Sequence, residues 1–295
     1  MKFAAIDIGS NAVRLAIARP LLIDKRNTEF KTIEFTRLPL RMGEDVFNKN
    51  EIGKQKIDLL HKSMQAFALL MEVYNVDFYR ACATSAMRDA NNSTEIIKSI
   101  KKETGVKINV ISGREESRLI QLAILEKIPR KHHLLHIDVG GGSTELAYLK
   151  DGKVKQFESF DIGTVRAKEG KIKSSEQDRM KAWLKELSSE TNNDLQAIGT
   201  GGNIVKLNQI SGTKSHEFNN TKKLISTLKM IKPMTEHEMV YDLKLNPDRA
   251  QVIRFAGDII IDILKSCEIQ EIMAPNVGLK DGIIQKLWSK YYKTK

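Results

Sequence analysis

The chain has 295 residues, of which 41% are hydrophobic and 29% charged, and its formal net charge is +11. This length exceeds one average domain, so two lobes of about 120–170 residues are expected, and the composition excludes wholesale disorder. No apolar run reaches the roughly 18 residues of a membrane span, and Asp7 and Arg14 interrupt the apolar N-terminal segment. We therefore expect a cytoplasmic protein without a membrane partner.

The excess positive charge favours an acidic partner, which could be a nucleic acid, an anionic membrane or a small polyanionic substrate. The lysines and arginines are scattered along the chain, aromatic residues make up only 6%, and no zinc-finger spacing occurs. These features argue against a nucleic-acid-binding protein. A generally basic surface without a specific anionic partner is the plainer alternative.

Two residue types that often mark metal sites give little signal here. Cys82 and Cys267 stand in no ligand pattern, so we expect free, buried thiols. His132, His133 and His136 cluster ahead of a predicted strand. A solvated turn is a better interpretation of this cluster than a zinc site.

The first part of the chain alternates predicted strands and helices. Apolar runs and turn residues predict a strand–turn–strand unit and two further strands, and helical periodicity predicts the helices between them. Gly105 is expected to end the second helix. In chain order, these elements cover residues 3–18, 51–74 (helix), 77–83 (strand), 92–103 (helix), 106–111 (strand) and 112–126 (helix).

The polar stretch 129–133 is the best candidate for a boundary, which predicts lobes 1–128 and 129–295, with the last helix able to pack back on the first lobe. The turn signal Asp151-Gly152 predicts a hairpin in the second lobe. The expected elements there are strands 134–139, 144–150 and 154–160, helix 174–190, strand 195–199, a mostly helical region 220–267, strand 271–275 and helix 278–292. The mixture predicts an α/β fold.

An internal repeat is the most informative feature of the sequence. Residues 6–17, IDIGSNAVRLAI, align with residues 137–148, IDVGGGSTELAY, at an offset of 131. Both copies read as strand–turn–strand, and both place an aspartate at the end of an apolar strand. Two duplicated lobes that face each other would produce this pattern, whereas chance similarity of two hairpins is the alternative.

The two loops of the repeat favour phosphate as the ligand. Glycine and small residues let successive backbone N–H groups approach an anion, and the hydroxyls of Ser10, Ser143 and Thr144 can donate to phosphate oxygens. An aspartate this close to a phosphate requires a cation between them. Asp7 and Asp138 are therefore interpreted as metal ligands, and Mg²⁺ suits such hard oxygen ligands. A third glycine turn, residues 198–203, is interpreted equally well as an anion site or as a plain turn.

Beyond the repeat, the chain resembles the Ppx/GppA phosphatases, a family of exopolyphosphatases and guanosine pentaphosphate phosphohydrolases. The resemblance covers nearly the whole chain. It rests on IDIGSNAVRL at 6–15, ATSAMRDA at 83–90, ISGREESRLIQLAI at 111–124, IDVGGGSTEL at 137–146, DIGTVRAKEG at 161–170, AIGTGGN at 197–203, DRAQVI at 248–253 and GLKDGI at 278–283.

The resemblance implies two ribonuclease-H-like lobes of the actin-like ATPase superfamily with a cleft between them. It also implies Mg²⁺-dependent release of terminal phosphate from polyphosphate, or conversion of pppGpp to ppGpp, with Mn²⁺ as an alternative metal. Partners would be these polyanionic substrates, with no nucleic acid, and a homodimer is compatible with the fold.

The resemblance also implies roles for individual residues. The catalytic glutamate of the family, 22 residues before the second-loop aspartate, falls on Glu116, which would accept a proton from the attacking water. The phosphate-binding positions fall on Ser10, Asn11, Arg14, Arg88, Gly140, Gly141, Gly142 and Ser143. The metal positions fall on Asp7, Asp138 and Glu145. Sequence alone would leave Glu116 as a first-turn glutamate that favours the helix dipole.

The sequence departs from the family pattern in three places. Ser117 replaces the alanine of EARL, and Gln251 replaces the acid of RADVI, so no role of that acid carries over. The chain also lacks the C-terminal helical domains with which longer members hold long polyphosphate chains. Their absence argues against high processivity. Two alternatives stay open: a non-catalytic binder of pppGpp or polyphosphate, and an actin-fold ATPase or kinase.

Overall fold

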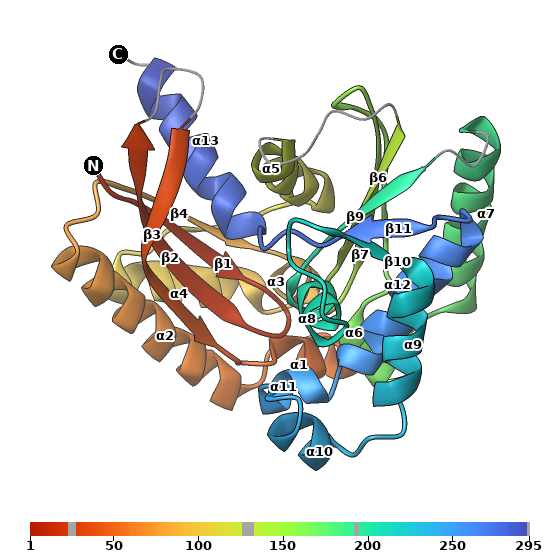
Figure 1. Ribbon diagram of the computed structural model, residues 1–295. Coiled ribbons are helices and arrows are strands. Elements are labelled where there is room, and N and C mark those ends of the chain that lie inside the picture. Colours follow the sequence, from red (N-terminus) through yellow and green to blue (C-terminus); the bar gives the residue numbers. More distant parts are fainter. Residues whose placement is uncertain (23–27, 126–132, 192–194, 294–295) are drawn as a thin grey trace. The chain divides into compact units, whose positions relative to one another are not determined.

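The computed structural model of the protein describes residues 1–22, 28–125, 133–191 and 195–293. The chain forms two compact units, Met1–Glu126 together with Gly278–Lys295, and Lys127–Val277 (Figure 1). The sequence division after residue 128 assigned all of 129–295 to the second lobe and allowed its last helix to pack on the first. The compact units divide two residues earlier and include Gly278–Lys295 in the first unit.

The first unit is built on a five-stranded mixed sheet of order β3-β2-β1-β4-β5. Its central strand β1 is buried along its whole length, as expected of a strand covered on both faces. β1 pairs antiparallel with β2 and parallel with β4. The strands are β1 (Phe3–Ile8), β2 (Val13–Leu22), β3 (Thr28–Leu38), β4 (Phe78–Ala83) and β5 (Ile108–Val110).

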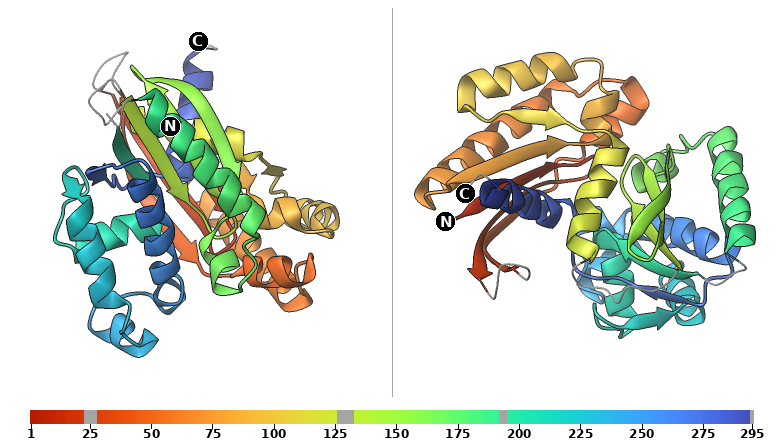
Figure 2. Two further views of the ribbon diagram at one scale, coloured as in Figure 1. Left: turned by 90° about the vertical axis from the view of Figure 1, so that its right-hand side faces the viewer. Right: turned by 90° about the horizontal axis from the view of Figure 1, so that it is seen from above.

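Six helices of the described residues complete the first unit. The terminal helix α13 packs on β1 and runs beside α5, as Figures 1 and 2 show. Rings from this helix, Trp288 and Tyr291, contact Phe3 on β1 edge to face. The helices are α1 (Met42–Lys49), α2 (Lys54–Val73), α3 (Ser85–Asp89), α4 (Ser93–Thr104), α5 (Gly113–Leu125) and α13 (Leu279–Lys293).

Close backbone approach between α5 and α13 depends on one glycine. A Cβ at Gly282 would overlap the backbone carbonyl of Leu119 on α5. Only a residue without a side chain allows the two helices to approach so closely. This contact explains why GLKDGI near the end of the chain belongs to the same unit as the segment 111–124.

The second unit has a six-stranded mixed sheet of order β10-β11-β9-β6-β7-β8. Its central strand β6 is buried at all but its first residue. The strands are β6 (His133–Val139), β7 (Thr144–Lys150), β8 (Lys153–Phe160), β9 (Gln196–Thr200), β10 (Phe218–Asn220) and β11 (Glu271–Met273). Asp151 and Gly152 both have positive φ, 51° and 73°, between β7 and β8, as the hairpin prediction requires.

The apolar helix α12 is central to the core of the second unit. Its buried residues include Ile260, Ile263 and Leu264, and it packs against α7, α8 and α9. The helices of this unit are α6 (Thr164–Lys168), α7 (Ser174–Glu190), α8 (Gly202–Ile210), α9 (Thr221–Ile231), α10 (Glu236–Tyr241), α11 (Pro247–Ala250) and α12 (Ile253–Ser266).

The two sheets repeat one topology. The order β3-β2-β1-β4-β5 in the first unit corresponds to β8-β7-β6-β9-β11 in the second, with the same pattern of parallel and antiparallel pairs. A register shift lies between Ile17 and Ala18 in one unit and between Tyr148 and Leu149 in the other. These positions are again 131 residues apart, so the duplication includes the irregularity of the hairpin.

The cysteines and histidines can now be placed. Cys82 and Cys267 are free and buried, as the sequence indicated. The interpretation of the histidine cluster as a solvated turn is wrong for His136, which is fully buried in β6. Its burial lowers the pKa of the imidazole to about 3, and Nε2 lies 2.9 Å from Oγ1 of Thr200. His132 lies outside the described residues.

Candidate functional site

The two loops of the repeat have the same turn geometry, one in each unit. The N–H of Gly9 donates to the carbonyl of Ala12 over 3.1 Å, and the N–H of Gly140 donates to the carbonyl of Ser143 over 2.9 Å. Each loop joins the end of a buried central strand to its antiparallel neighbour. The sequence repeat therefore corresponds to a repeat in backbone conformation.

The helix that follows each hairpin fixes the orientation of the loop peptides. The carbonyl of Ser10 accepts from the N–H of Gly43 in α1 over 2.8 Å, and the carbonyl of Gly141 accepts from the N–H of Val165 in α6 over 2.8 Å. A Cβ at Gly163 would overlap the Gly141 carbonyl, so this approach requires glycine. With their carbonyls engaged on one side, the loops are held in a fixed conformation.

The first loop is also joined to α3. Ser10 is buried, and its Oγ lies 2.7 Å from Oγ of Ser85 at the start of that helix. The exposed Arg88 belongs to the same helix, and its Nη1 donates to the carbonyl of Ile111 over 2.9 Å. The structure thus links two predicted phosphate ligands, Ser10 and Arg88, through Ser85. The sequence did not single out Ser85; its place in the ATSAMR segment was the available signal.

The strand that follows each loop carries a charged residue opposite the loop aspartate, and this charge is positive in the first unit and negative in the second. Asp7 is the cross-strand partner of Arg14, whose Nη1 donates to its Oδ2 over 2.8 Å. At the equivalent position in the second unit, Asp138 is the partner of Glu145. A cation thus already neutralises the first aspartate, whereas the second stands opposite a like charge.

The carboxylate pair of the second unit is largely removed from water. Asp138 is 9% exposed and Glu145 only 2%. Oε1 of Glu145 accepts from Oγ of Ser159 on β8 over 2.9 Å. Two buried carboxylates on facing strand positions repel each other unless a cation or a proton comes between them. The predicted hairpin already paired these two strands, but the register that places Ser159 opposite Glu145 comes from the structure.

This carboxylate pair fits a magnesium ion that retains other ligands. Within the described ranges, no three His, Cys, Asp or Glu side chains come together as a potential metal-binding group. Mg²⁺, however, is commonly bound by one or two carboxylates and completes its shell with water and substrate phosphates. Asp138 and Glu145 supply that donor set.

A glycine turn lies against Asp138, and an arginine lies against that turn. A Cβ at Gly201 would lie 3.1 Å from Oδ1 of Asp138, and one at Gly202 would lie 2.6 Å from Nη2 of Arg249. Sequence reasoning left this turn undecided between an anion site and a plain turn. Its contact with Asp138 makes it part of the neighbourhood of the second loop, and Arg249 adds a cation there that the sequence did not single out.

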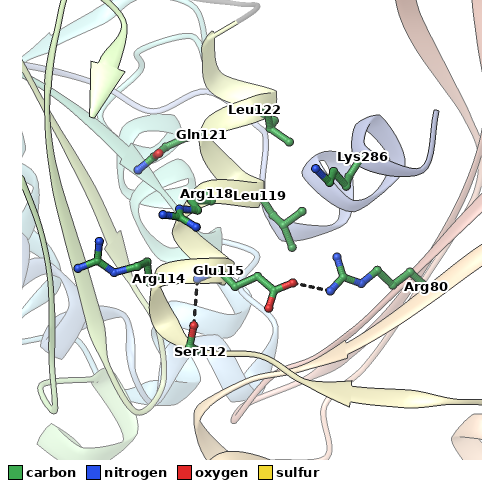
Figure 3. Close-up of a pocket in the computed structure, with 9 residues that line it drawn as sticks. All are labelled: Arg80, Ser112, Arg114, Glu115, Arg118, Leu119, Gln121, Leu122 and Lys286. Carbon is green, nitrogen blue, oxygen red and sulfur yellow. Dashed lines mark hydrogen bonds and ion pairs between the residues drawn. The ribbon is translucent and has the colours of Figure 1, made fainter. Parts of the chain in front are cut away.

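Glu116 and Glu115 are adjacent in α5 but have different surroundings. Glu115 forms a 2.5 Å ion pair with Arg80, which Figure 3 shows. Glu116 is half-buried in the first turn of the helix, where its N–H donates to the carbonyl of Ser112 over 2.9 Å.

Asp7 and Glu116 both lie near the thiol of Cys82. Burial raises the pKa of this thiol to about 12, Arg80 opposes the rise, and the charges of Asp7, Glu115 and Glu116 add to it. Cys82 is also the parallel-strand partner of Asp7. The strand end that carries Asp7 and the first turn of α5 therefore both lie near Cys82.

The family model for the Ppx/GppA phosphatase family matches residues 21–290. A bifunctional 3-dehydroquinate synthase/phosphatase of Fusobacterium nucleatum is 32% identical over 285 residues, which are 88% of this chain and 42% of that protein. Exopolyphosphatase 1 of Mycobacterium tuberculosis is 32% identical over 168 residues, 56% of this chain and 47% of that protein. The chain thus spans less than half the length of these curated relatives.

Solved structures agree on the fold. An exopolyphosphatase from Cytophaga hutchinsonii superimposes with a TM-score of 0.84 at 21% identity, over 98% of both chains. The Ppx/GppA family member of Aquifex aeolicus gives a TM-score of 0.76 at 24% identity, over 100% of this chain and 99% of that one. No helix in the described part of the chain has both the length and the apolarity for a membrane span. The α/β fold with two sheet-based lobes is confirmed, and the chain belongs to the Ppx/GppA phosphatase family.

Proposed function

We propose that this protein hydrolyses phosphoanhydride bonds and releases the terminal phosphate of inorganic polyphosphate, or converts pppGpp to ppGpp. The observation that carries the proposal is the duplicated loop, flanked by the ion pair Asp7–Arg14 in one unit and by the carboxylates Asp138 and Glu145 in the other. Membership of a phosphatase family and the names of two exopolyphosphatases among the similar proteins support this choice.

The loops are assigned to phosphate oxygens. In the second unit, Gly140, Gly141, Gly142 and Ser143 would offer backbone N–H groups and a hydroxyl, and their fixed turn reduces the entropy lost on binding. In the first unit, Ser10, Asn11, Arg88 and Arg14 take the same role. A guanidinium has five N–H donors, so the bond of Arg14 to Asp7 leaves others for a phosphate.

Asp138 and Glu145 are assigned to Mg²⁺, with Mn²⁺ as an alternative. When bound there, the ion would neutralise charge on phosphate oxygens during transfer. Ser159 orients Glu145 by donating to Oε1, as hydrogen-bonded neighbours of metal ligands commonly do. Asp7 as a third ligand is the weakest assignment because Arg14 already occupies one of its oxygens.

Glu116 is assigned as the base that accepts a proton from the attacking water. A base must lie within hydrogen-bond reach of the water from which it takes the proton. The family resemblance places this role on Glu116 and not on Glu115, which forms an ion pair with Arg80 at 2.5 Å. Glu116 and Asp7 both lie near Cys82, so a base at Glu116 is compatible with a site at the end of β1.

The test is phosphate release by the wild type, Glu116→Gln and the matched control Glu115→Gln. Long polyphosphate, tripolyphosphate, pppGpp and ATP are each supplied with Mg²⁺ and with EDTA. We expect metal-dependent release from at least one of the first three, and a loss of at least about a hundredfold in Glu116→Gln, the usual size of a general-base contribution. Glu115→Gln should lose less than about tenfold.

Equal losses of phosphate release in Glu116→Gln and Glu115→Gln would refute the assignment of Glu116 as the base. Tight binding of pppGpp or polyphosphate without release by the wild type would replace the hydrolase with a sensor. Release from ATP alone would favour the ATPase alternative.

A further inference from the structure

We propose that the first unit holds a second ligand site, a pocket on α5 that takes a small organic phosphate with an apolar ring, such as a mononucleotide. The pocket has a volume of about 600 Å³. That volume lies in the range of pockets that hold small molecules. Its lining residues come from β4, α5, α13 and the residue just before α5, all within the first unit, and Figure 3 shows them.

Cations line two sides of the pocket. Arg114 and Arg118 extend to one side of α5, whereas Arg80 and Lys286 approach the other side from β4 and α13 (Figure 3). One carboxylate, Glu115, also lines it, and Arg80 neutralises this group at 2.5 Å. Four cationic side chains and one carboxylate therefore line the pocket, so positive charge predominates, and arginine favours phosphate because its planar fork can make two bonds at once.

The floor of the pocket is apolar. Leu119 is buried beneath it, and Leu122, one turn further along α5, is 40% exposed although it is a large hydrophobic residue. An inorganic polyphosphate chain has no apolar surface to place on these leucines. A nucleotide has both parts, because its base can cover the leucines while its phosphate reaches the arginines.

This pocket is distinct from the proposed catalytic groups. Arg114, Arg118 and Leu122 recur at a spacing of four, and Glu115 and Leu119 likewise, so together they cover one broad side of α5. Glu116 does not line the pocket. Helix α5 would thus carry the proposed base on one side and a ligand site on the other. A ligand in the pocket would contact α5 and α13 together.

The test locates binding directly through the ¹³C-methyl NMR signals of Leu119 and Leu122. The full chain is titrated in EDTA, without added metal, with AMP, with adenosine and with inorganic tripolyphosphate. AMP contains no phosphoanhydride bond, so the result does not depend on the proposed hydrolysis. We expect AMP to shift both signals saturably, and adenosine and tripolyphosphate to bind at this position at least tenfold more weakly.

The variant Arg118→Ala/Lys286→Ala removes two cations from the pocket. AMP should bind it about a hundredfold more weakly, the effect of two lost charge-assisted bonds. The control Lys98→Ala/Lys290→Ala removes two exposed lysines from α4 and α13 outside the pocket and should bind AMP as the wild type does. All these side chains are exposed, and unchanged thermal unfolding would show that both variants fold.

Several outcomes would overturn the proposal. Leucine signals that do not move with AMP would refute a ligand site in this pocket. Equal or tighter binding of tripolyphosphate would make it a site for inorganic anions rather than for a nucleotide. An unchanged affinity of the pocket variant would refute the role of the cations.

Discussion

At the scale of single residues, one position of the duplicated hairpin separates the roles of the two lobes. Arg14 and Glu145 lie 131 residues apart, each directly opposite the aspartate that ends its central strand. The first position supplies a cation to Asp7, whereas the second adds a negative charge to Asp138. This single difference favours a phosphate-binding lobe and a metal-binding lobe.

Replacing Glu145 with arginine should convert the second hairpin to the charge pattern of the first. Because the new guanidinium would neutralise Asp138, we expect Mg²⁺ affinity to fall at least tenfold, measured by isothermal titration calorimetry. Glu145→Gln, which removes the charge without adding one, should have a smaller effect. Unchanged Mg²⁺ affinity in Glu145→Arg would show that the metal binds elsewhere.

The two thiols should be inert in the folded protein. Burial raises the pKa of Cys82 and of Cys267 to about 12, so both stay protonated at pH 8, and only thiolates react rapidly with disulfide reagents. Titration with such a reagent at pH 8 should label neither residue until urea unfolds the chain. Rapid labelling of the native protein would contradict this account.

The same pKa values set the alkaline limit of stability. The unfolded chain releases its thiol protons near pH 8.5, whereas the folded chain holds them until about pH 12. The thiols' contribution to stability is therefore full below about pH 8.5 and is lost as the pH rises toward 12. Urea unfolding from pH 8 to 10 should show this decline, and it should be smaller in Cys267→Ala than in the wild type.

At the scale of elements, patterns in the sequence predicted the well-buried parts of the fold. Helix α7 has the predicted bounds, and Gly105 ends α4 in a left-handed conformation with φ of 72°. Strand β3 was missed because it is a partly exposed edge strand whose apolar residues, Phe30, Ile33, Phe35 and Leu38, do not recur at the regular spacing of two that indicates a strand. The five-residue helices α3 and α6 are too short for helical periodicity to appear.

Patterns in the sequence likewise predicted part of the candidate site. The repeat gave both loops and both aspartates because matched spacing is visible in the sequence. Ser85, Ser159 and Arg249 were not predicted, since each acts through a neighbour that only the fold supplies. The roles of the predicted residues stay predictions until variants test them.

Gly282→Ala should separate α13 from α5. The added methyl group would overlap the Leu119 carbonyl, and overpacking of this kind costs about 1–3 kcal/mol. Gly278→Ala is the matched control, because nothing lies within 4 Å of the Cβ position at Gly278. Urea unfolding should show the loss only for Gly282→Ala, and equal stabilities would refute the close approach.

At the scale of the whole molecule, the first unit is discontinuous in sequence and the second is continuous. Residues 278–295 return to the first unit, where rings of α13 pack against Phe3. The second unit holds its own hydrophobic core around α12. We therefore expect the two units to differ in their ability to fold as isolated fragments.

A fragment of residues 127–277 should fold by itself, with a cooperative urea transition. A fragment of residues 1–126 should not, because it would expose the apolar surface that α13 covers. Adding a peptide of residues 278–295 should restore its structure, measured by circular dichroism and by the dispersion of NMR signals. A cooperatively folded 1–126 fragment without the peptide would contradict the division.

The most direct test of a metal-dependent phosphohydrolase is the rate of phosphate release as a function of Mg²⁺ concentration, for the wild type and Asp138→Asn, on whichever of long polyphosphate, tripolyphosphate and pppGpp the wild type hydrolyses. We expect no release by the wild type in EDTA, saturable release with Mg²⁺, and a loss of at least about a hundredfold in Asp138→Asn at every concentration. Release that continues in EDTA, or that Asp138→Asn retains in full, would contradict the account.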